Sequence, residues 1–136
     1  RTRNGVVDYC NTVFQFEDPS LVVFATSGVI NQQGRAFTHG FEIHLEKATM
    51  HYEFAGFADE AELMPLKILT DDGQVVRPDV GGGDPTDSFQ DEVREVVRCV
   101  EANEPSKVLA GDLARDAIVL CHKQSESVLE GRTVEI

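Results

Sequence analysis

The spacing of apolar side chains predicts two long helices in residues 87–136. In the first, apolar residues recur at three- and four-residue steps, which places them on one helix face: Phe89, Val93, Val96, Val97 and Val100. Asp87 is expected to cap this helix, with Gln90 reaching back as in a capping box. Asn103 to Ser106 should end it. A second helix is expected from about Ala110 to Glu130, and Gly131 should stop it by adopting a left-handed conformation.

The first part of the chain favours strands. Six are expected, at Val6–Phe16, Leu21–Ile30, Ala36–Leu45, Ala48–Phe54, Glu62–Thr70 and Gln74–Arg77. The run that starts at Leu21 is almost continuously apolar, so we expect that strand to be covered on both faces. Asp72-Gly73 predicts a type I′ turn, and Pro65 predicts an edge or a bulge. Arg132 to Ile136 alternates polar and apolar residues, as a short closing strand would.

Together these elements predict an α+β fold: a mainly antiparallel open sheet with two long C-terminal helices packed on one face, closed by a short C-terminal strand. The chain length fits a single domain, residues 1–136. Within it we expect a sheet-forming part at 1–77, a Gly/Pro linker at 78–86 and a helix-helix-strand part at 87–136.

One predicted hairpin brings chemistry-bearing side chains together. If Lys47-Ala48 forms its loop, His44 lies directly opposite His51. Because side chains alternate across a strand, one face then holds Phe41, Ile43, Leu45, Met50, Tyr52 and Phe54. The other face holds Glu42, His44, Glu46, Thr49, His51 and Glu53.

This polar face has three interpretations. It is a solvated or subunit-contacting sheet face, as antiparallel sheets commonly have. Alternatively, both histidines and one carboxylate hold a metal ion such as zinc. A third interpretation is that the face contacts substrate. The residues on which these interpretations depend are Glu42, His44, His51 and Glu53.

Charge and cysteine content exclude several classes of function. The formal net charge is −12, which repels phosphate backbones and anionic lipid, so we expect neither a nucleic-acid nor a membrane partner. No apolar run approaches the roughly 20 residues that span a bilayer. Cys10, Cys99 and Cys121 are odd in number and lack Cys-x-x-Cys spacing, so we expect small buried side chains rather than disulfides or zinc ligands. A reducing cytoplasm fits this pattern best.

Two further patterns are weak. Gly81 to Asp84 precedes a helix but lacks the order of a dinucleotide or phosphate loop. Ser125 and Ser127 lie near His122 on one predicted helix, with no acid to orient the histidine as in a nucleophilic triad.

The chain resembles a known enzyme family. The ending from Ser127 to Ile136, with a helix that finishes in Ser, three residues and Gly before a short strand, is similar to the C-terminus of the Gfo/Idh/MocA oxidoreductases. Asp8 in a first strand, the Phe16-Glu17-Asp18 turn and the hairpin from Ile43 to Tyr52 also fit that family's C-terminal domain.

The resemblance implies a fragment of a two-domain enzyme, consistent with a first residue, Arg1, that is not methionine. A Rossmann domain, absent here, would bind NAD or NADP and supply a catalytic lysine. This chain would be the substrate-binding and oligomerisation domain of a dehydrogenase for a sugar, inositol or related polyol, inactive alone and homo-oligomeric through its sheet face. It would hold no catalytic, cofactor-binding or metal residues. The alternative is a stand-alone interaction or dimerisation module with no redox role.

Overall fold

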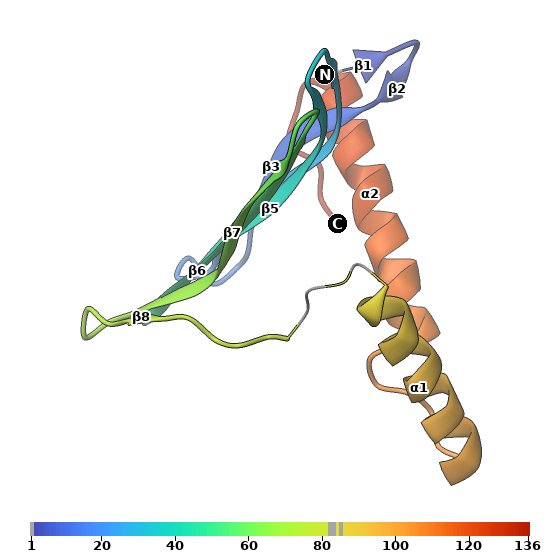
Figure 1. Cartoon of the computed structure of the whole chain (residues 1–136). Helices are drawn as coiled ribbons and strands as arrows, with labels where there is room; N and C mark the ends of the chain where they lie inside the picture. The colour runs from blue at the N-terminus through green and yellow to red at the C-terminus, as the bar shows by residue number, and fades with distance from the viewer. Residues whose placement is uncertain (1, 82–83, 85) are drawn as a thin grey trace. The chain divides into compact units, whose positions relative to one another are not determined.

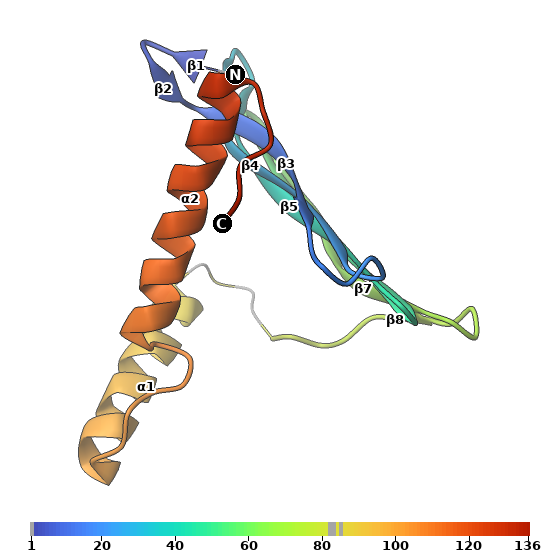
Figure 2. The same ribbon diagram turned by 180° about the vertical axis from the view of Figure 1, so that it is seen from behind.

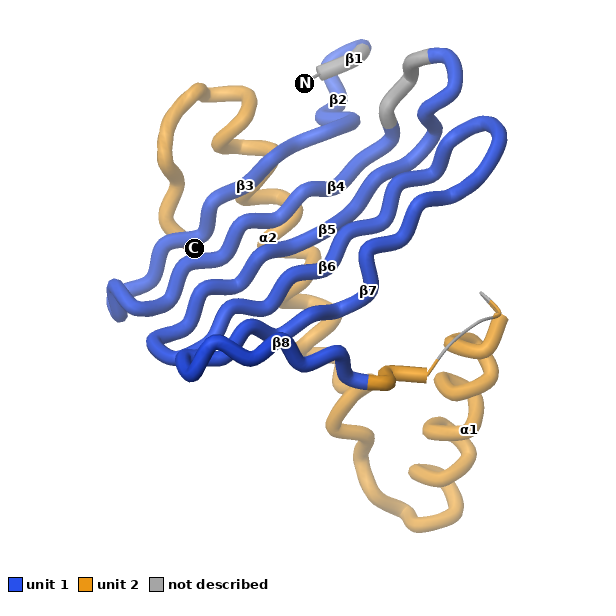
Figure 3. The backbone as a smooth tube through the Cα atoms, turned by 60° about the vertical axis from the view of Figure 1, so that its left-hand side comes forward, with its two compact units in different colours: residues 1–78 blue, residues 79–136 orange. Residues whose placement is uncertain are grey.

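The chain divides into two compact units, residues 1–78 and residues 79–136 (Figures 1 and 3). The computed structural model describes residues 2–81, 84 and 86–136. The boundary falls at the start of the predicted linker, of which residues 82, 83 and 85 lie outside the described residues. The first unit is built of strands and the second of helices, so the α+β class is confirmed.

The first unit is an antiparallel meander in which each strand pairs with the next along the chain (Figure 3). Its main sheet contains β3 (Tyr9–Gln15), β4 (Val22–Gln32), β5 (Arg35–Leu45), β6 (Ala48–Phe57), β7 (Ala61–Thr70) and β8 (Val75–Val76). A separate two-stranded sheet pairs β1 (Thr2–Arg3) with β2 (Val6–Val7). The predicted first strand is therefore divided, and the other five lie close to their expected ranges.

The β7–β8 turn differs from the prediction. Gly73 has φ +81°, but Asp72 is not among the described residues with positive φ, as a type I′ turn requires. The amide of Gly73 donates to the oxygen of Thr70, and the amide of Thr70 donates to the oxygen of Gln74. The loop is therefore a three-residue turn, Asp71 to Gly73, that ends in a left-handed glycine.

Of the two alternatives predicted for Pro65, an edge strand or a bulge, the structure shows a bulge. His51 pairs with Lys67, whereas Glu53 pairs with Met64, so Pro65 and Leu66 together face the single residue between His51 and Glu53. Proline has no amide hydrogen for the ladder, and a bulge tolerates this loss.

The strand register defines two faces of the sheet, because residues directly opposite each other share a face. The apolar face includes Phe14, Val23, Phe41, Ile43, Met50, Tyr52, Phe54 and Ile68. The mixed face combines charged, polar and apolar side chains: Asn11, Val13, Phe24, Glu42, His44, His51, Glu53, Lys67 and Leu69.

Burial is shallow. Among the described residues, the most buried side chains are Thr38, 1% exposed, and Ala55, 8% exposed, which face each other on the mixed face. Phe24 in the interior strand β4 is 43% exposed, so the expectation that this strand is covered on both faces is wrong. Its residues alternate between the two faces, and the mixed face leaves Phe24 open.

The second unit contains α1 (Asp87–Ala102) and α2 (Gly111–Glu130), with a chain reversal between them (Figures 1 and 2). The predicted ranges are confirmed, but the capping box is wrong. Thr86 occupies the N-cap without a side-chain cap bond, and Asp84 accepts instead from the amide and hydroxyl of Thr86. The apolar stripe of α1 is open to solvent: Val100 is 75% exposed.

The segment after α2 does not form the predicted closing strand. Gly131 ends the helix with φ +64° and donates its amide to the oxygen of Ser127 at 2.9 Å. Arg132 then forms ion pairs with Glu126 and Glu130. These contacts hold the start of the segment at the last turn of α2, which explains why polar alternation alone does not produce a strand here.

The cysteines are free thiols. Cys10 and Cys99 are half-buried, but Cys121 is exposed, so the expectation of three buried side chains is wrong for Cys121. It lies on a stretch of α2 whose apolar residues, such as Ile118, are themselves exposed. Within the described residues, no helix is long and apolar enough to cross a membrane.

Candidate functional site

The four predicted site residues lie on the mixed face, but in a different register from the one expected. The β5–β6 turn is Glu46-Lys47 instead of Lys47-Ala48, so Leu45 pairs with Ala48. Each partner is therefore displaced by two residues. A displacement of two preserves the faces, because side chains alternate with period two.

The displacement separates the two histidines. His51 lies opposite Glu42, and His44 lies opposite Thr49. Glu53 lies opposite Gly40. The direct His44–His51 pair is therefore wrong, because the turn begins one residue earlier than the sequence suggested.

His44 is the centre of a short chain of polar contacts. Its Nε2 lies 3.2 Å from Oε1 of Glu42, and its Nδ1 lies 3.4 Å from the hydroxyl oxygen of Thr49. The ring of Phe24 meets the imidazole edge-on at 5.6 Å between centroids. His44 and Glu42 remain about two-fifths exposed, so water screens this pair and its contribution to stability is small.

Thr49, His44 and Glu42 place a hydroxyl, an imidazole and a carboxylate in contact one after the other, as in a nucleophilic triad. Such a triad also needs donors aimed at the developing oxyanion. Here Thr49 and His44 lie on paired strands beside the β5–β6 turn, where backbone amides serve the ladder. Among the described residues, no group of three or more His, Cys, Asp or Glu side chains could hold a metal ion. The arrangement therefore suits polar contact with a partner or ligand.

Apolar side chains on β3 and β4 lie beside charged and polar side chains on β5, β6 and β7 of the mixed face. Glu42, His51 and Lys67 form one row across β5, β6 and β7. Phe24 continues that row onto β4, and Val13, 54% exposed, continues it onto β3. Exposed aromatic and aliphatic groups beside charges are typical of a surface that contacts another molecule.

Gly40 makes a small hollow in the mixed face. A Cβ atom at Gly40 would lie 2.8 Å from the backbone oxygen of Tyr52, so a side chain does not fit there. The hollow measures about 160 Å³, and Phe24, Thr26, Glu42 and Glu53 are among its lining residues. Of the predicted site residues, Glu42, His51 and Glu53 line it, whereas His44 does not.

A larger groove of about 430 Å³ lies on the same face beside the β7 bulge. Its charged lining residues are Arg35, Glu53, Glu62 and Lys67. Of these four residues, only Glu53 was among the site residues predicted from the sequence. Pro65 was the available signal, because a bulge often lies beside a functional site, but sequence alone does not show which side chains converge on it.

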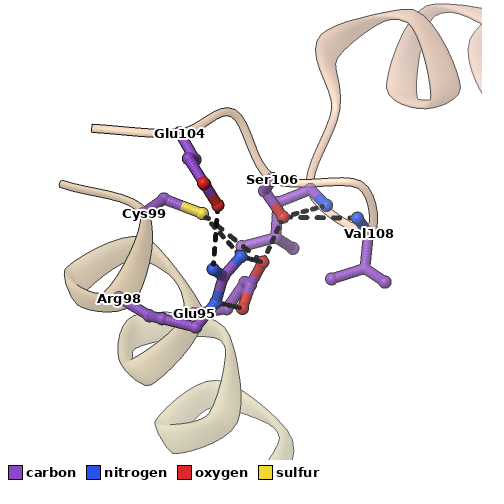
Figure 4. A network of polar contacts seen from close by, with 7 residues as sticks. Glu95, Arg98, Cys99, Glu104, Ser106 and Val108 are labelled. Atoms are coloured by element: carbon purple, nitrogen blue, oxygen red, sulfur yellow. Dashed lines mark hydrogen bonds and ion pairs between the residues drawn. The ribbon is translucent and has the colours of Figure 1, made fainter. Parts of the chain in front are cut away.

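The second unit contains a separate polar network centred on Glu95 (Figure 4). Arg98 donates to both carboxylate oxygens of Glu95 at 2.8 Å, and the Ser106 hydroxyl donates to Oε1 at 2.7 Å. Ser106 also accepts from the amides of Val108 and Leu109. The guanidinium, followed by the hydroxyl, lowers the pKa of Glu95 to about 2. The network fastens the interhelical loop to α1.

The two weak sequence patterns have structural explanations. Ser127 donates its hydroxyl to the backbone oxygen of Arg132 at 2.6 Å, which is a helix-end contact. Gly81, with φ +68°, follows an irregular segment, and the nearest strand, β8, ends at Val76. The part of the loop that is described does not fit a dinucleotide, because a dinucleotide loop connects a strand directly to a helix.

Comparisons with protein-family models, with curated proteins and with solved structures gave no match to this chain.

Proposed function

We propose that the chain is the C-terminal substrate-binding and oligomerisation domain of an NAD(P)-dependent oxidoreductase that acts on a sugar, inositol or related polyol. The nucleotide would bind to a Rossmann domain of the same parent protein, in the cytoplasm. The nicotinamide would accept or donate the hydride, and this domain would orient substrate and hold subunits together.

The observation that carries the proposal is the geometry of the helix ending. Ser127 accepts the Gly131 amide on its backbone oxygen and donates its hydroxyl to the oxygen of Arg132. The Ser-x-x-x-Gly spacing that resembles the oxidoreductase family therefore has a physical role: serine and glycine together terminate α2. The residues that carry the resemblance, Ser127 and Gly131, are thus the ones that form the hydrogen bonds at the helix end.

The mixed face supports the oligomerisation part of the proposal. Phe24, Leu69 and Val75 are each more than two-fifths exposed on it. Glu42 and Lys67 lie in one row of the same face, two strands apart. A surface that carries both charges and exposed apolar groups can pair with a second copy of itself.

A second candidate function is a stand-alone dimerisation module without redox chemistry. The same mixed face favours it, because an interface requires no cofactor. The first candidate function requires a Rossmann domain in the same native protein, and the second does not. Both predict that the chain associates with itself through the sheet.

Sedimentation of the chain with Phe24→Lys tests the role of the face. We expect the unchanged chain to sediment as an oligomer, and the lysine variant to dissociate because it buries an unpaired charge. Val108→Lys is the control, since Val108 is an exposed apolar residue of the interhelical loop. An oligomer that withstands Phe24→Lys would contradict this role. Tight binding of NAD to the isolated chain would contradict the assignment of the nucleotide to another domain.

A further inference from the structure

The groove beside the β7 bulge is open to solvent and has the volume of a small-molecule site. Its volume of about 430 Å³ lies within the roughly 300–1,000 Å³ usual for ligand pockets. Ala55 is among its lining residues, and its small side chain leaves room above the sheet. Pro65 also lines the groove, at the bulge that displaces β7 from regular pairing.

Among the described residues, Arg35 has contacts that position it at the groove but no counter-ion. Its Nη2 donates to the hydroxyl of Thr38 at 3.1 Å, and its guanidinium carbon lies 6.0 Å from the ring centroid of Phe57. Its Nε is buried and has no hydrogen-bond partner among the described residues, so a ligand in the groove can meet this guanidinium only through its Nη atoms. The Nη atoms of a planar guanidinium are suited to a carboxylate. The site therefore favours a ligand carboxylate at Arg35.

The other charged groups of the groove limit the rest of the ligand. Glu53 and Glu62 are exposed, and Lys67 is half-buried. Among the described residues, none of these three forms an ion pair. The carboxylates of Glu53 and Glu62 disfavour a ligand with two negative charges. The cationic side chains of Arg35 and Lys67 disfavour a ligand whose only charged group is an amine. A neutral molecule with separated charges satisfies both signs.

We propose that this groove binds a small zwitterion of the amino-acid class. Arg35 takes the carboxylate, Glu53 and Glu62 attract the ammonium group, and an apolar side chain contacts Met64 and Pro65. The proposal concerns a different part of the mixed face from His44 and does not depend on the proposed oxidoreductase function.

Three related probes separate the two charges. L-leucine carries both, 4-methylpentanoate lacks the ammonium group, and 3-methylbutylamine lacks the carboxylate. Titrations of the full chain, followed by amide NMR, should show leucine shifting the resonances of Ala55, Glu62 and Met64. The two single-charge probes should bind at least about tenfold more weakly. No leucine-dependent shift in the groove, or equal binding of 4-methylpentanoate, would overturn the proposal.

Variants test the assignment of each charge. Arg35→Gln should weaken leucine binding about tenfold or more, because it removes a charged donor. Glu62→Gln changes an exposed carboxylate and should also weaken leucine binding, which keeps the proposal testable if Arg35→Gln fails to fold. Arg94→Gln on α1 is the control, because Arg94 contacts only Gln90 and Asp91 among the described residues. Unchanged affinity in Glu62→Gln, or in a folded Arg35→Gln, would refute the proposal.

Discussion

The hydroxyl of Ser127 donates a hydrogen bond to the backbone oxygen of Arg132, 2.6 Å away, across the glycine that ends α2. This bond satisfies a carbonyl just beyond the helix and holds Arg132 at the last turn of α2. It gives the Ser-x-x-x-Gly spacing a local structural cause. It also explains why Arg132, despite its place in an alternating segment, is not part of a strand.

Ser127→Ala should lower the free energy of unfolding by about 1 kcal/mol, because it removes one hydrogen bond at the helix end. Urea unfolding followed by circular dichroism measures this change. Ser125→Ala is the matched control, since the Ser125 hydroxyl makes no hydrogen bond within the described part of the chain. Equal effects of the two substitutions would show that the Ser127 bond contributes nothing specific.

Gly40→Ala should destabilise the sheet by about 1–3 kcal/mol, because the new Cβ would lie 2.8 Å from the oxygen of Tyr52 and backbone must move. Gly56→Ala on the neighbouring strand is the control, since its nearest neighbour atom would be at 3.5 Å, an ordinary contact. The denaturation midpoints of both variants decide the comparison. A Gly40→Ala chain as stable as Gly56→Ala would contradict the close approach of β5 and β6.

Glu95 should titrate far below an ordinary glutamate. Arg98 and then Ser106 hold its pKa near 2 in the folded chain, against an ordinary value of 4.5. A carboxyl group whose pKa is lower in the folded than in the unfolded state stabilises the fold at every pH above the unfolded-state pKa. The contribution of Glu95 is therefore complete above about pH 4.5 and is lost as pH falls toward 2.

Carbon-13 NMR of the Glu95 carboxyl group measures this titration directly. Ser106→Ala should raise the pKa of Glu95, because it removes the hydroxyl donor, and Arg94→Gln should leave it unchanged. A midpoint near 4.5 in the unchanged chain would show that the network does not form in solution.

Local patterns predicted the elements well where one short-range signal dominates. The apolar spacing from Phe89 to Val100 gave α1, and Gly131 and Pro65 marked a helix end and a bulge. The errors arose where two local signals compete. Lys47-Ala48 and Glu46-Lys47 are both acceptable two-residue loops, and pairing across the whole hairpin decides between them.

The candidate site was only partly predictable. Its face was predictable because side-chain alternation survives a displacement of two residues, so Glu42, His44, His51 and Glu53 share one surface. The contact partners of His44 were not predictable, since they depend on the register between β5 and β6. Arg35 was not predictable either, because its role comes from contacts with Thr38 and Phe57 in three dimensions.

Sequencing the native transcript upstream of the Arg1 codon tests the proposed function most directly. We expect it to encode a strand, a Gly-x-Gly-x-x-Gly loop and a helix, the nucleotide-binding unit that this chain would complete. A native protein without such a unit would contradict the oxidoreductase proposal and favour the stand-alone dimerisation module.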